Sequence, residues 1–176
     1  MNVIVVPFMV LAALGFALSA YAHAMAMLNL PTPWGESVWF LHVGIFVVWL
    51  PAVLVAQRVV RNSSRKDFWK IALLGCPPWM RTMVFVLFGY ALLNFLYFIA
   101  LNRNGGTGTA NQGSTIRGFS GHWLLFYGAA FAIMCSATRR PDLLTGLKCA
   151  NGHDVDPLSQ HCGTCGVRIQ RNELDA

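Results

Sequence analysis

Charged residues are scarce in this chain, and their scarcity argues against a soluble domain. Asp, Glu, Lys and Arg make up 11% of its 176 residues, whereas soluble domains carry roughly a quarter of such residues. Apolar residues make up 56% of the sequence. This balance is typical of a membrane protein rather than of a soluble domain.

Acidic residues are missing from every long apolar segment, and this absence argues against several functions. Proton- and cation-coupled transporters usually depend on carboxylates inside the membrane, and many contain inverted repeats, neither of which the sequence shows. The sequence also lacks a phosphate-binding loop, paired carboxylates and a nucleophile with an evident neighbouring base. It therefore does not indicate a conventional enzyme.

Four segments are long and apolar enough to cross a hydrocarbon core, which takes about 20 residues. They cover residues 3–22, 38–56, 82–101 and 119–137. The first is not expected to be a cleaved signal peptide, because no Lys or Arg precedes it and its apolar run is too long. The sequence thus predicts an all-α membrane protein, with four transmembrane helices in residues 1–140 and a separate tail in residues 141–176.

Basic residues fall almost entirely on one side of these segments. Of the 13 Lys and Arg residues, 11 lie between the second and third segments or after the fourth, and the other two are Arg103 and Arg117. Since Lys and Arg accumulate in cytoplasmic loops, both termini are predicted to lie in the cytoplasm. The formal net charge of +6 therefore reflects membrane topology, and we do not expect nucleic acid as a partner.

The basic stretch between the second and third segments carries the signals of a short helix over residues 64–75. Ser64 suits the N-cap position and Asp67 the first turn, and a pair of prolines ends the helix. Its composition fits two arrangements, a helix in the lipid headgroup layer or a connector packed against the other helices. The stretch 102–120, rich in Gly, Asn and Thr, is expected to be a mobile loop.

Four metal-ligating residues lie close together in the tail. Three residues separate Cys149 from His153, and two separate Cys162 from Cys165. Zinc prefers four thiolate or imidazole ligands in a tetrahedron, and three cysteines with one histidine are a common structural set. The spacing therefore predicts two metal-binding knuckles that face each other.

A bound metal would also explain how so short a tail can fold. About 30 residues bury too little surface to offset their chain entropy, whereas a structural zinc contributes on the order of 10–16 kcal/mol. Disulfides are the alternative, but the predicted cytosolic location is reducing. Gly163 and Gly166 tolerate the positive φ that lets backbone N–H groups point at the sulfurs, and Asp156-Pro157 suits a turn between the knuckles.

This stretch resembles the zinc ribbons of the C-x-x-G-H … C-x-x-C-G kind that are appended to many bacterial membrane proteins. The matching residues are 149–153 and 162–166. The resemblance implies a small β-hairpin-like unit in a protein of the bacterial inner membrane. Its implied zinc ligands are Cys149, His153, Cys162 and Cys165. One departure is His161, because such ribbons often carry an aromatic residue just before the third ligand. The resemblance does not extend to the four apolar segments.

Three histidines fall at one depth, in the predicted outer leaflet: His23, His42 and His122. Imidazoles inside a membrane segment are candidates for a functional site. A pair of them can ligate a b-type haem iron, or the three can bind copper together with Met25 and Met27. The alternative is that these imidazoles hydrogen-bond to the backbone or to lipid headgroups.

Small and polar residues indicate where the helices pack. His23 shares a stripe with Gly15 and Ser19 at a spacing of four residues, so we expect it to face the other helices. Three polar residues share one face of the third segment: Tyr90, Asn94 and Tyr97. Such residues usually link helices through hydrogen bonds, although they can also line a passage.

Together these features predict a non-catalytic membrane protein that displays a zinc ribbon in the cytosol, where it docks or assembles with a protein partner. Two alternatives stay open. One is an electron-transfer or copper-handling protein that uses His23, His42 and His122 with haem or copper. The other is a small transporter or channel, lined by the polar face of the third segment.

Overall fold

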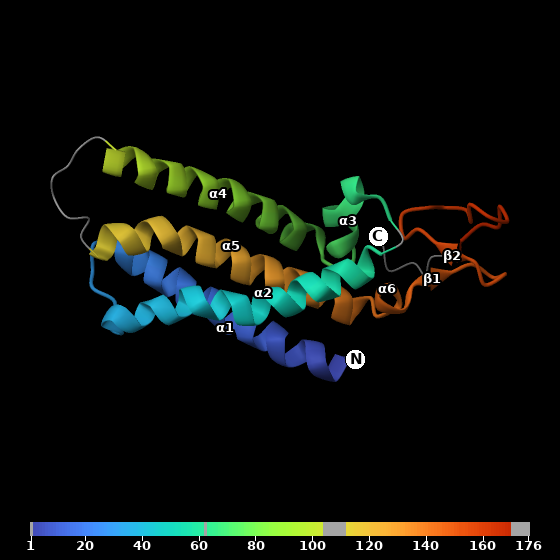
Figure 1. Cartoon of the computed structure of the whole chain (residues 1–176), viewed down its shortest axis with the longest axis horizontal. Helices are drawn as coiled ribbons and strands as arrows, with labels where there is room; N and C mark the ends of the chain where they lie inside the picture. The colour runs from blue at the N-terminus through green and yellow to red at the C-terminus, as the bar shows by residue number, and fades with distance from the viewer. Residues whose placement is uncertain (1, 62, 104–111, 170–176) are drawn as a thin grey trace.

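A computed structural model of the chain describes residues 2–61, 63–103 and 112–169, and four long helices dominate it (Figure 1). They are α1 (Asn2–Met27), α2 (Phe40–Val59), α4 (Pro78–Arg103) and α5 (Gln112–Arg139). A short 3-10 helix, η1 (Gly35–Trp39), precedes α2. All four helices are long and apolar enough to cross a membrane, which confirms the prediction of four such segments.

The last long helix begins well before the predicted residue 119. The stretch 112–120, which we expected to belong to a mobile loop, forms the first turns of α5, so that prediction is wrong for these residues. Residues 104–111 of the expected loop lie outside the described residues. Packing overrides the weak helix propensity of this stretch. Ile116 is buried, and the Phe98 ring packs so closely against Gly118 that a Cβ on residue 118 would lie 2.5 Å from the nearest ring atom.

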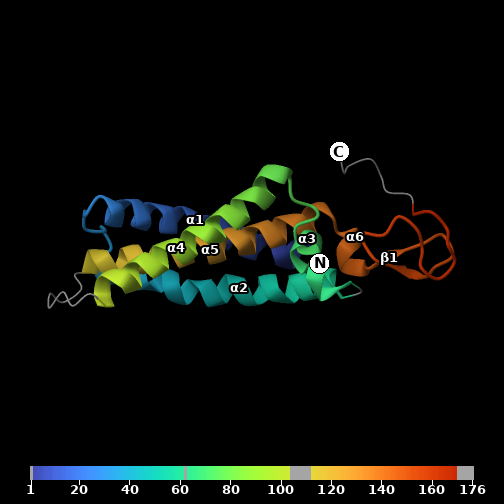
Figure 2. The same ribbon diagram turned by 90° about the horizontal axis from the view of Figure 1, so that it is seen from above.

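Helix α5 is the centre around which the other three pack. It lies between α4 and the pair formed by α1 and α2 in Figure 1, and between α1 and α2 in Figure 2. Within its membrane-length segment 67% of the residues are buried, against 17–22% in the other three helices. This position explains why α5 is the least apolar of the four, since it meets protein on most sides.

Tyr127 shows how closely the helices approach α5. Its ring lies against Gly15 of α1, where a Cβ would come within 2.2 Å, and its hydroxyl lies against Gly44 of α2. The hydroxyl donates a hydrogen bond of 2.8 Å to the carbonyl of Leu41. Two glycines on different helices therefore make room for one large side chain of α5.

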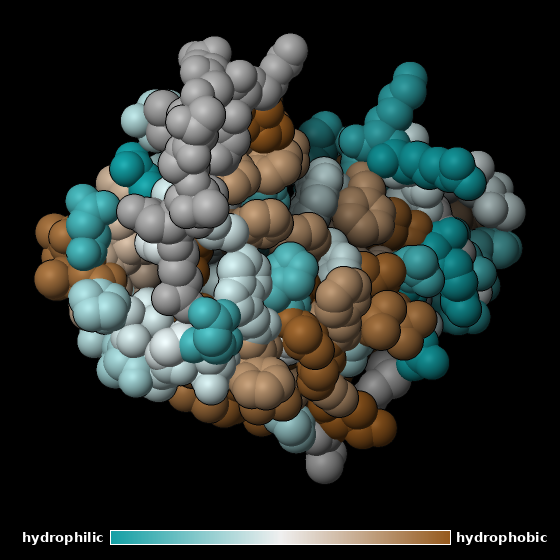
Figure 3. Space-filling model, turned by 60° about the vertical axis from the view of Figure 1, so that its left-hand side comes forward, coloured by the Kyte–Doolittle hydropathy of each residue, from teal (hydrophilic) through white to brown (hydrophobic). Residues whose placement is uncertain are grey.

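The outward faces of α1, α2 and α4 carry large apolar side chains that the protein leaves uncovered. Phe40, Leu93 and Ile4 are among the most exposed of them. In Figure 3, hydrophobic side chains lie over a large part of the face on view. An exposed apolar surface of this extent is expected of helices that face lipid.

The basic connector contains the 3-10 helix η2 (Arg65–Asp67) and the short helix α3 (Phe68–Ala72). The Ser64 side chain accepts a hydrogen bond of 3.3 Å from the Lys66 N–H, as its N-cap position predicts. The helix ends at residue 72 rather than 75. Ile71, Ala72 and Leu73 are fully buried, so this face of the connector packs against the other helices.

Gly75 fixes the connector to α5. Its N–H donates a hydrogen bond of 2.9 Å to the hydroxyl of Ser136. A Cβ at this position would come within 2.4 Å of the Ser136 carbonyl oxygen. The backbone of the connector can therefore approach α5 only because residue 75 lacks a side chain.

The tail forms a small unit, the tail unit, from helix α6 (Asp142–Thr145) onward, at the same end of the molecule as α3 and the start of α1 (Figure 1). Strand β1 (Leu147–Lys148) pairs antiparallel with β2 (Asp154–Val155). The buried side chain of Leu143 joins the core of the helices, and Leu147 and Leu158 pack against the same core. These apolar contacts hold the tail unit against the helical region.

Candidate metal centre

The first knuckle of the tail unit follows strand β1. The N–H of Cys149 donates to the carbonyl of His153 at 3.0 Å, and the N–H of Gly152 donates to the carbonyl of Cys149 at 2.9 Å. Gly152 has a φ of +81°, a conformation that glycine adopts without steric cost. The chain therefore turns tightly between the two ligating side chains, and β2 begins directly after His153.

The second knuckle repeats this arrangement. The N–H of Cys162 donates to the carbonyl of Val167, and the N–H of Gly166 donates to the carbonyl of Cys162, both at 2.9 Å. Gly166 has a φ of +70°, as the sequence led us to expect, whereas Gly163 does not adopt a positive φ. Glycine is thus required by backbone conformation at 166 but not at 163.

A turn at Asp156 brings the second knuckle back to the first. The Asp156 carboxylate accepts a hydrogen bond of 2.7 Å from the N–H of Leu158, and its carbonyl accepts one of 3.0 Å from the N–H of Ser159. This is an Asx-type turn, at the position where the Asp-Pro pair predicted one.

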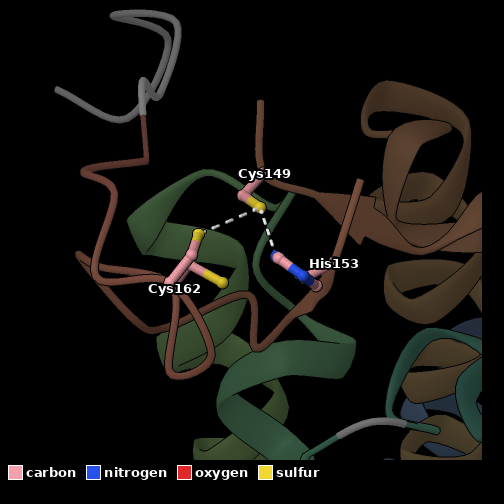
Figure 4. A group of neighbouring side chains, drawn as sticks. Cys149, His153 and Cys162 are labelled. Atoms are coloured by element: carbon pink, nitrogen blue, oxygen red, sulfur yellow. Dashed lines mark hydrogen bonds between the residues drawn. The ribbon is translucent and has the colours of Figure 1, made fainter. Parts of the chain in front are cut away.

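The four ligand atoms converge. Each of Cys149, His153, Cys162 and Cys165 offers one atom, and all four atoms lie within 4.8 Å of one another. Figure 4 shows the labelled side chains pointing toward a common centre. The Cys149 Sγ lies 3.5 Å from the His153 Nδ1 and 3.7 Å from the Cys165 Sγ. A tetrahedron around zinc has edges of about 3.5 Å for sulfur to nitrogen and about 3.8 Å for sulfur to sulfur.

Backbone N–H groups favour the thiolate form in the second knuckle. Hydrogen bonds from the N–H groups of Cys165 and Thr164 lower the pKa of the Cys162 thiol to about 6. In the first knuckle, burial raises the pKa of the Cys149 thiol, although N–H groups of His153 and Asn151 oppose that shift. The amides thus point at the sulfurs as expected of metal-binding knuckles, and a cation would favour both thiolates further.

His161 is the other histidine of the tail, and it takes no part in the cluster. It is exposed and forms an isolated β-bridge with Arg168. Within the described residues, the Cys149 group is the one set of three or more metal-ligating side chains that can share an ion. The structure therefore shows a cluster of three cysteines and one histidine that can hold a metal ion.

The three histidines of the helices do not form a group of this kind. Both ring nitrogens of His23 are engaged: Nδ1 lies 2.6 Å from the Ser120 hydroxyl oxygen, and Nε2 hydrogen-bonds to the Tyr90 hydroxyl. A metal ion or haem iron at His23 would have to displace one of these partners. His23 faces the other helices, as its stripe with Gly15 and Ser19 predicted.

His42 and His122 are set among aromatic rings. The Nδ1 of His42 accepts a hydrogen bond of 3.0 Å from the indole N–H of Trp123. The His122 ring stands edge-on to Phe95, with 4.7 Å between ring centroids, and both imidazoles lie about 6 Å from the ring of Phe119. These contacts suit partly buried histidines that pack among aromatic rings, and no third His, Cys, Asp or Glu joins them as a ligand among the described residues.

The polar face of α4 links helices, as the sequence predicted. Asn94 donates to the carbonyl oxygens of Arg117 and Gly118 on α5, at 2.8 and 3.2 Å. The guanidinium of Arg117 lies 5.3 Å from the centre of the Tyr97 ring, a cation–π contact. Because neighbouring helices engage these side chains, the structure gives no support to a passage lined by them.

Sequence reasoning missed the pairing of Ser120 with His23. The two residues are 97 positions apart, and Tyr90 is 67 positions from His23. The stripe of small residues on α1 was the one available signal of this contact. It indicated which face of α1 packs against other helices but not which residue His23 contacts. Ser120 is fully buried, so its hydroxyl connects α1 to α5 rather than meeting a substrate from solvent.

Two cysteines of the helical region lie outside the cluster of Cys149, His153, Cys162 and Cys165. Burial raises the pKa of the Cys76 thiol to about 12, and the thiol donates to the carbonyl of Ala132 at 3.1 Å. Cys135 is partly buried nearby. A buried, protonated and hydrogen-bonded thiol such as that of Cys76 is expected to be unreactive.

Comparisons with protein-family models, with curated proteins and with solved structures found no match to this chain. The chemistry of the site therefore rests on its own geometry.

Proposed function

We propose that the chain is a non-catalytic integral membrane protein whose tail unit is a structural zinc ribbon on the cytosolic face. The observation that carries this proposal is the convergence of Cys149, His153, Cys162 and Cys165 within 4.8 Å. Three thiolates and one imidazole select zinc over magnesium or calcium, which prefer oxygen ligands. All four positions are filled by protein, as in structural rather than catalytic zinc sites.

The distribution of charge supports the cytosolic placement. The connector and the tail unit, which together hold most of the Lys and Arg residues, lie at the same end of the helices (Figure 1). The positive-inside rule places that end in the cytoplasm. A reducing compartment keeps the three cysteines of the cluster free to bind metal.

The position of the tail unit supports a role in docking. Leu143 and Leu147 hold one side of it against the helical region. The tips of both knuckles, residues 150–152 and 163–164, are exposed, and Figure 1 shows the tail unit projecting beyond the helices. A rigid, exposed pair of loops at a fixed distance from the membrane suits assembly with a protein partner.

Metal analysis and partner capture test the two parts of this proposal separately. The purified chain is expected to hold one zinc, with no copper and no haem absorption band, and Cys162→Ser with Cys165→Ser is expected to remove the zinc. Capture should then compare wild type with this variant and with Thr164→Arg, which alters an exposed knuckle tip but leaves every ligand in place. Docking predicts that both variants lose the same partner. Recovery of identical partners by all three proteins would contradict docking, and copper or haem in place of zinc would contradict the ribbon.

A further inference from the structure

An apolar groove runs along the helical region between α2 and α4, which both pack on α5. It has a volume of about 290 Å³. Its lining residues are Trp49, Trp69, Val84, Phe85, Phe88, Leu125, Phe126 and Ala129. Val84 and Ala129 form a buried floor, while Phe85 and Phe88 are more than half exposed at its rim. The groove therefore opens sideways, toward the lipid.

The groove lies within the leaflet on the connector side. Trp69 stands at its connector end, and Phe88 lies ten residues into α4, which begins at Pro78. At 1.5 Å per residue this is about 15 Å, half of a hydrocarbon core of about 30 Å. A single acyl chain that runs down from the headgroup layer would follow this path.

The connector carries positive charge close in sequence to Trp69, which lines the groove. Arg65, Lys66 and Lys70 are exposed and lie within four residues of Trp69, which lines the groove and is itself exposed. Asp67 is the one acidic residue between the second and third predicted spans, and it pairs with Lys70 at 3.0 Å. Arg65 and Lys66 therefore give this part of the connector a net positive charge.

We propose that this groove is a binding site for an anionic phospholipid of the adjacent leaflet. One acyl chain lies against Trp49 and Phe88, and the phosphate meets Arg65 and Lys66. A second copy of the chain is a poorer occupant, because its own basic connector would meet this one with like charge. The inference rests on the membrane placement proposed above but not on the zinc.

Brominated lipids test this proposal, because bromine quenches tryptophans that it touches. The full-length protein is placed in phosphatidylcholine vesicles that contain phosphatidylglycerol, with bromine on the acyl chains of one lipid or the other. The signal of wild type minus that of Trp49→Phe reports the groove alone. Phosphatidylglycerol is expected to bind at least about fivefold more tightly than phosphatidylcholine, the effect of one basic residue near a membrane surface.

Three variants separate the chain-binding and charge contributions. Ala129→Phe fills the floor of the groove and is expected to abolish quenching of Trp49 by either lipid. Arg65→Gln with Lys66→Gln is expected to abolish the preference for phosphatidylglycerol. Arg168→Gln, which removes a charge from the tail unit instead, is expected to leave that preference unchanged.

Equal quenching of wild type by both lipids would overturn the proposal, and so would a preference that survives loss of Arg65 and Lys66. Cross-linking of two chains through residues of the groove, with Trp49 shielded from quenching by both lipids, would show that a second copy of the chain occupies the groove instead. If Ala129→Phe does not fold, Arg65→Gln with Lys66→Gln still tests the proposal, because both residues are exposed and their substitution should not affect folding. Cys162→Ser should lose zinc yet keep the lipid preference, so this proposal and the ribbon proposal fail independently.

Discussion

The helical region and the tail unit are stabilised by different means. Helix α5 is surrounded by three neighbours, and large side chains such as Tyr127 fill glycine-lined gaps between them. Apart from Leu143, which joins the core of the helices, the tail unit buries few apolar side chains, chiefly Val155 with Cys149 and Cys162, and its two strands have two residues each. The helical region depends on close packing of backbones. The tail unit, which buries so little, is expected to depend on a metal ion shared by its four ligands.

Removal of the metal should produce the largest difference between the two regions. A structural zinc contributes on the order of 10–16 kcal/mol to a unit of this size. Chelation or Cys162→Ser is therefore expected to unfold residues 147–169 while α1, α2, α4 and α5 keep their structure. Hydrogen exchange followed by mass spectrometry measures this directly, since only tail amides should lose protection.

Cys135→Ser is the matched control, because it removes a cysteine from the helical region and no ligand. It is expected to leave exchange in the tail unit unchanged. Continued protection of the tail amides after complete loss of metal would show that apolar contacts alone fold the unit.

Thiol reactivity should also separate the two regions. Burial raises the pKa of Cys76 to about 12, about three units above that of an ordinary thiol. At pH 8 its thiolate is then about a thousandfold rarer than that of an ordinary thiol. After chelation, peptide mass spectrometry with an alkylating reagent is expected to show fast labelling of Cys149 and Cys162, with Cys76 labelled only after denaturation. Equal labelling rates in the folded protein would contradict the buried, protonated state of Cys76.

The sequence was informative where interactions are local. The Ser64 cap acts on the residue two positions later, and the four clustered ligands fall within 17 consecutive residues. Helix length and apolar composition identify the four long helices without any knowledge of their neighbours. Each of these features depends on a short stretch of chain, so spacing alone is sufficient.

The features that were missed depend on how distant segments meet. The contact of Ser120 with His23 and the approach of Gly75 to Ser136 join residues 97 and 61 positions apart. The early start of α5 has the same cause, because Ile116 and Gly118 gain their helical role only by packing against other helices. Local propensity, which favours a loop over this stretch, cannot include such contacts.

A methyl group at Gly75 should weaken the helical region and leave the metal centre intact. In Gly75→Ala the new Cβ would lie 2.4 Å from the Ser136 carbonyl oxygen, and a backbone oxygen cannot move aside by rotation of a side chain. Overpacking of this kind costs about 1–3 kcal/mol. We expect a lower thermal midpoint by circular dichroism and an unchanged zinc content.

Gly89→Ala is the matched control, since nothing lies within 4 Å of a Cβ there. Alanine replaces glycine in the middle of α4, so the helix should be as stable as before or slightly more stable. If both variants lowered the thermal midpoint equally, the close contact at Gly75 would not be the cause.

The smallest expected effect concerns the polar link between helices. Ser120 and Tyr90 flank His23 through its two ring nitrogens, and hydrogen bonds inside membrane proteins average about 0.6 kcal/mol each. Tyr90→Phe and Ser120→Ala are each expected to lower the free energy of unfolding by about that amount. A double-mutant cycle tests whether His23 couples them: since both partners engage one imidazole, the combined loss should differ from the sum of the single losses. Tyr21→Phe is the control for loss of a hydroxyl, because Tyr21 lies on the same helix as His23 but takes no part in the hydrogen bonds of His23 with Tyr90 and Ser120. Strict additivity of Tyr90→Phe and Ser120→Ala would show that the two hydrogen bonds contribute separately, one joining α1 to α4 and the other joining α1 to α5.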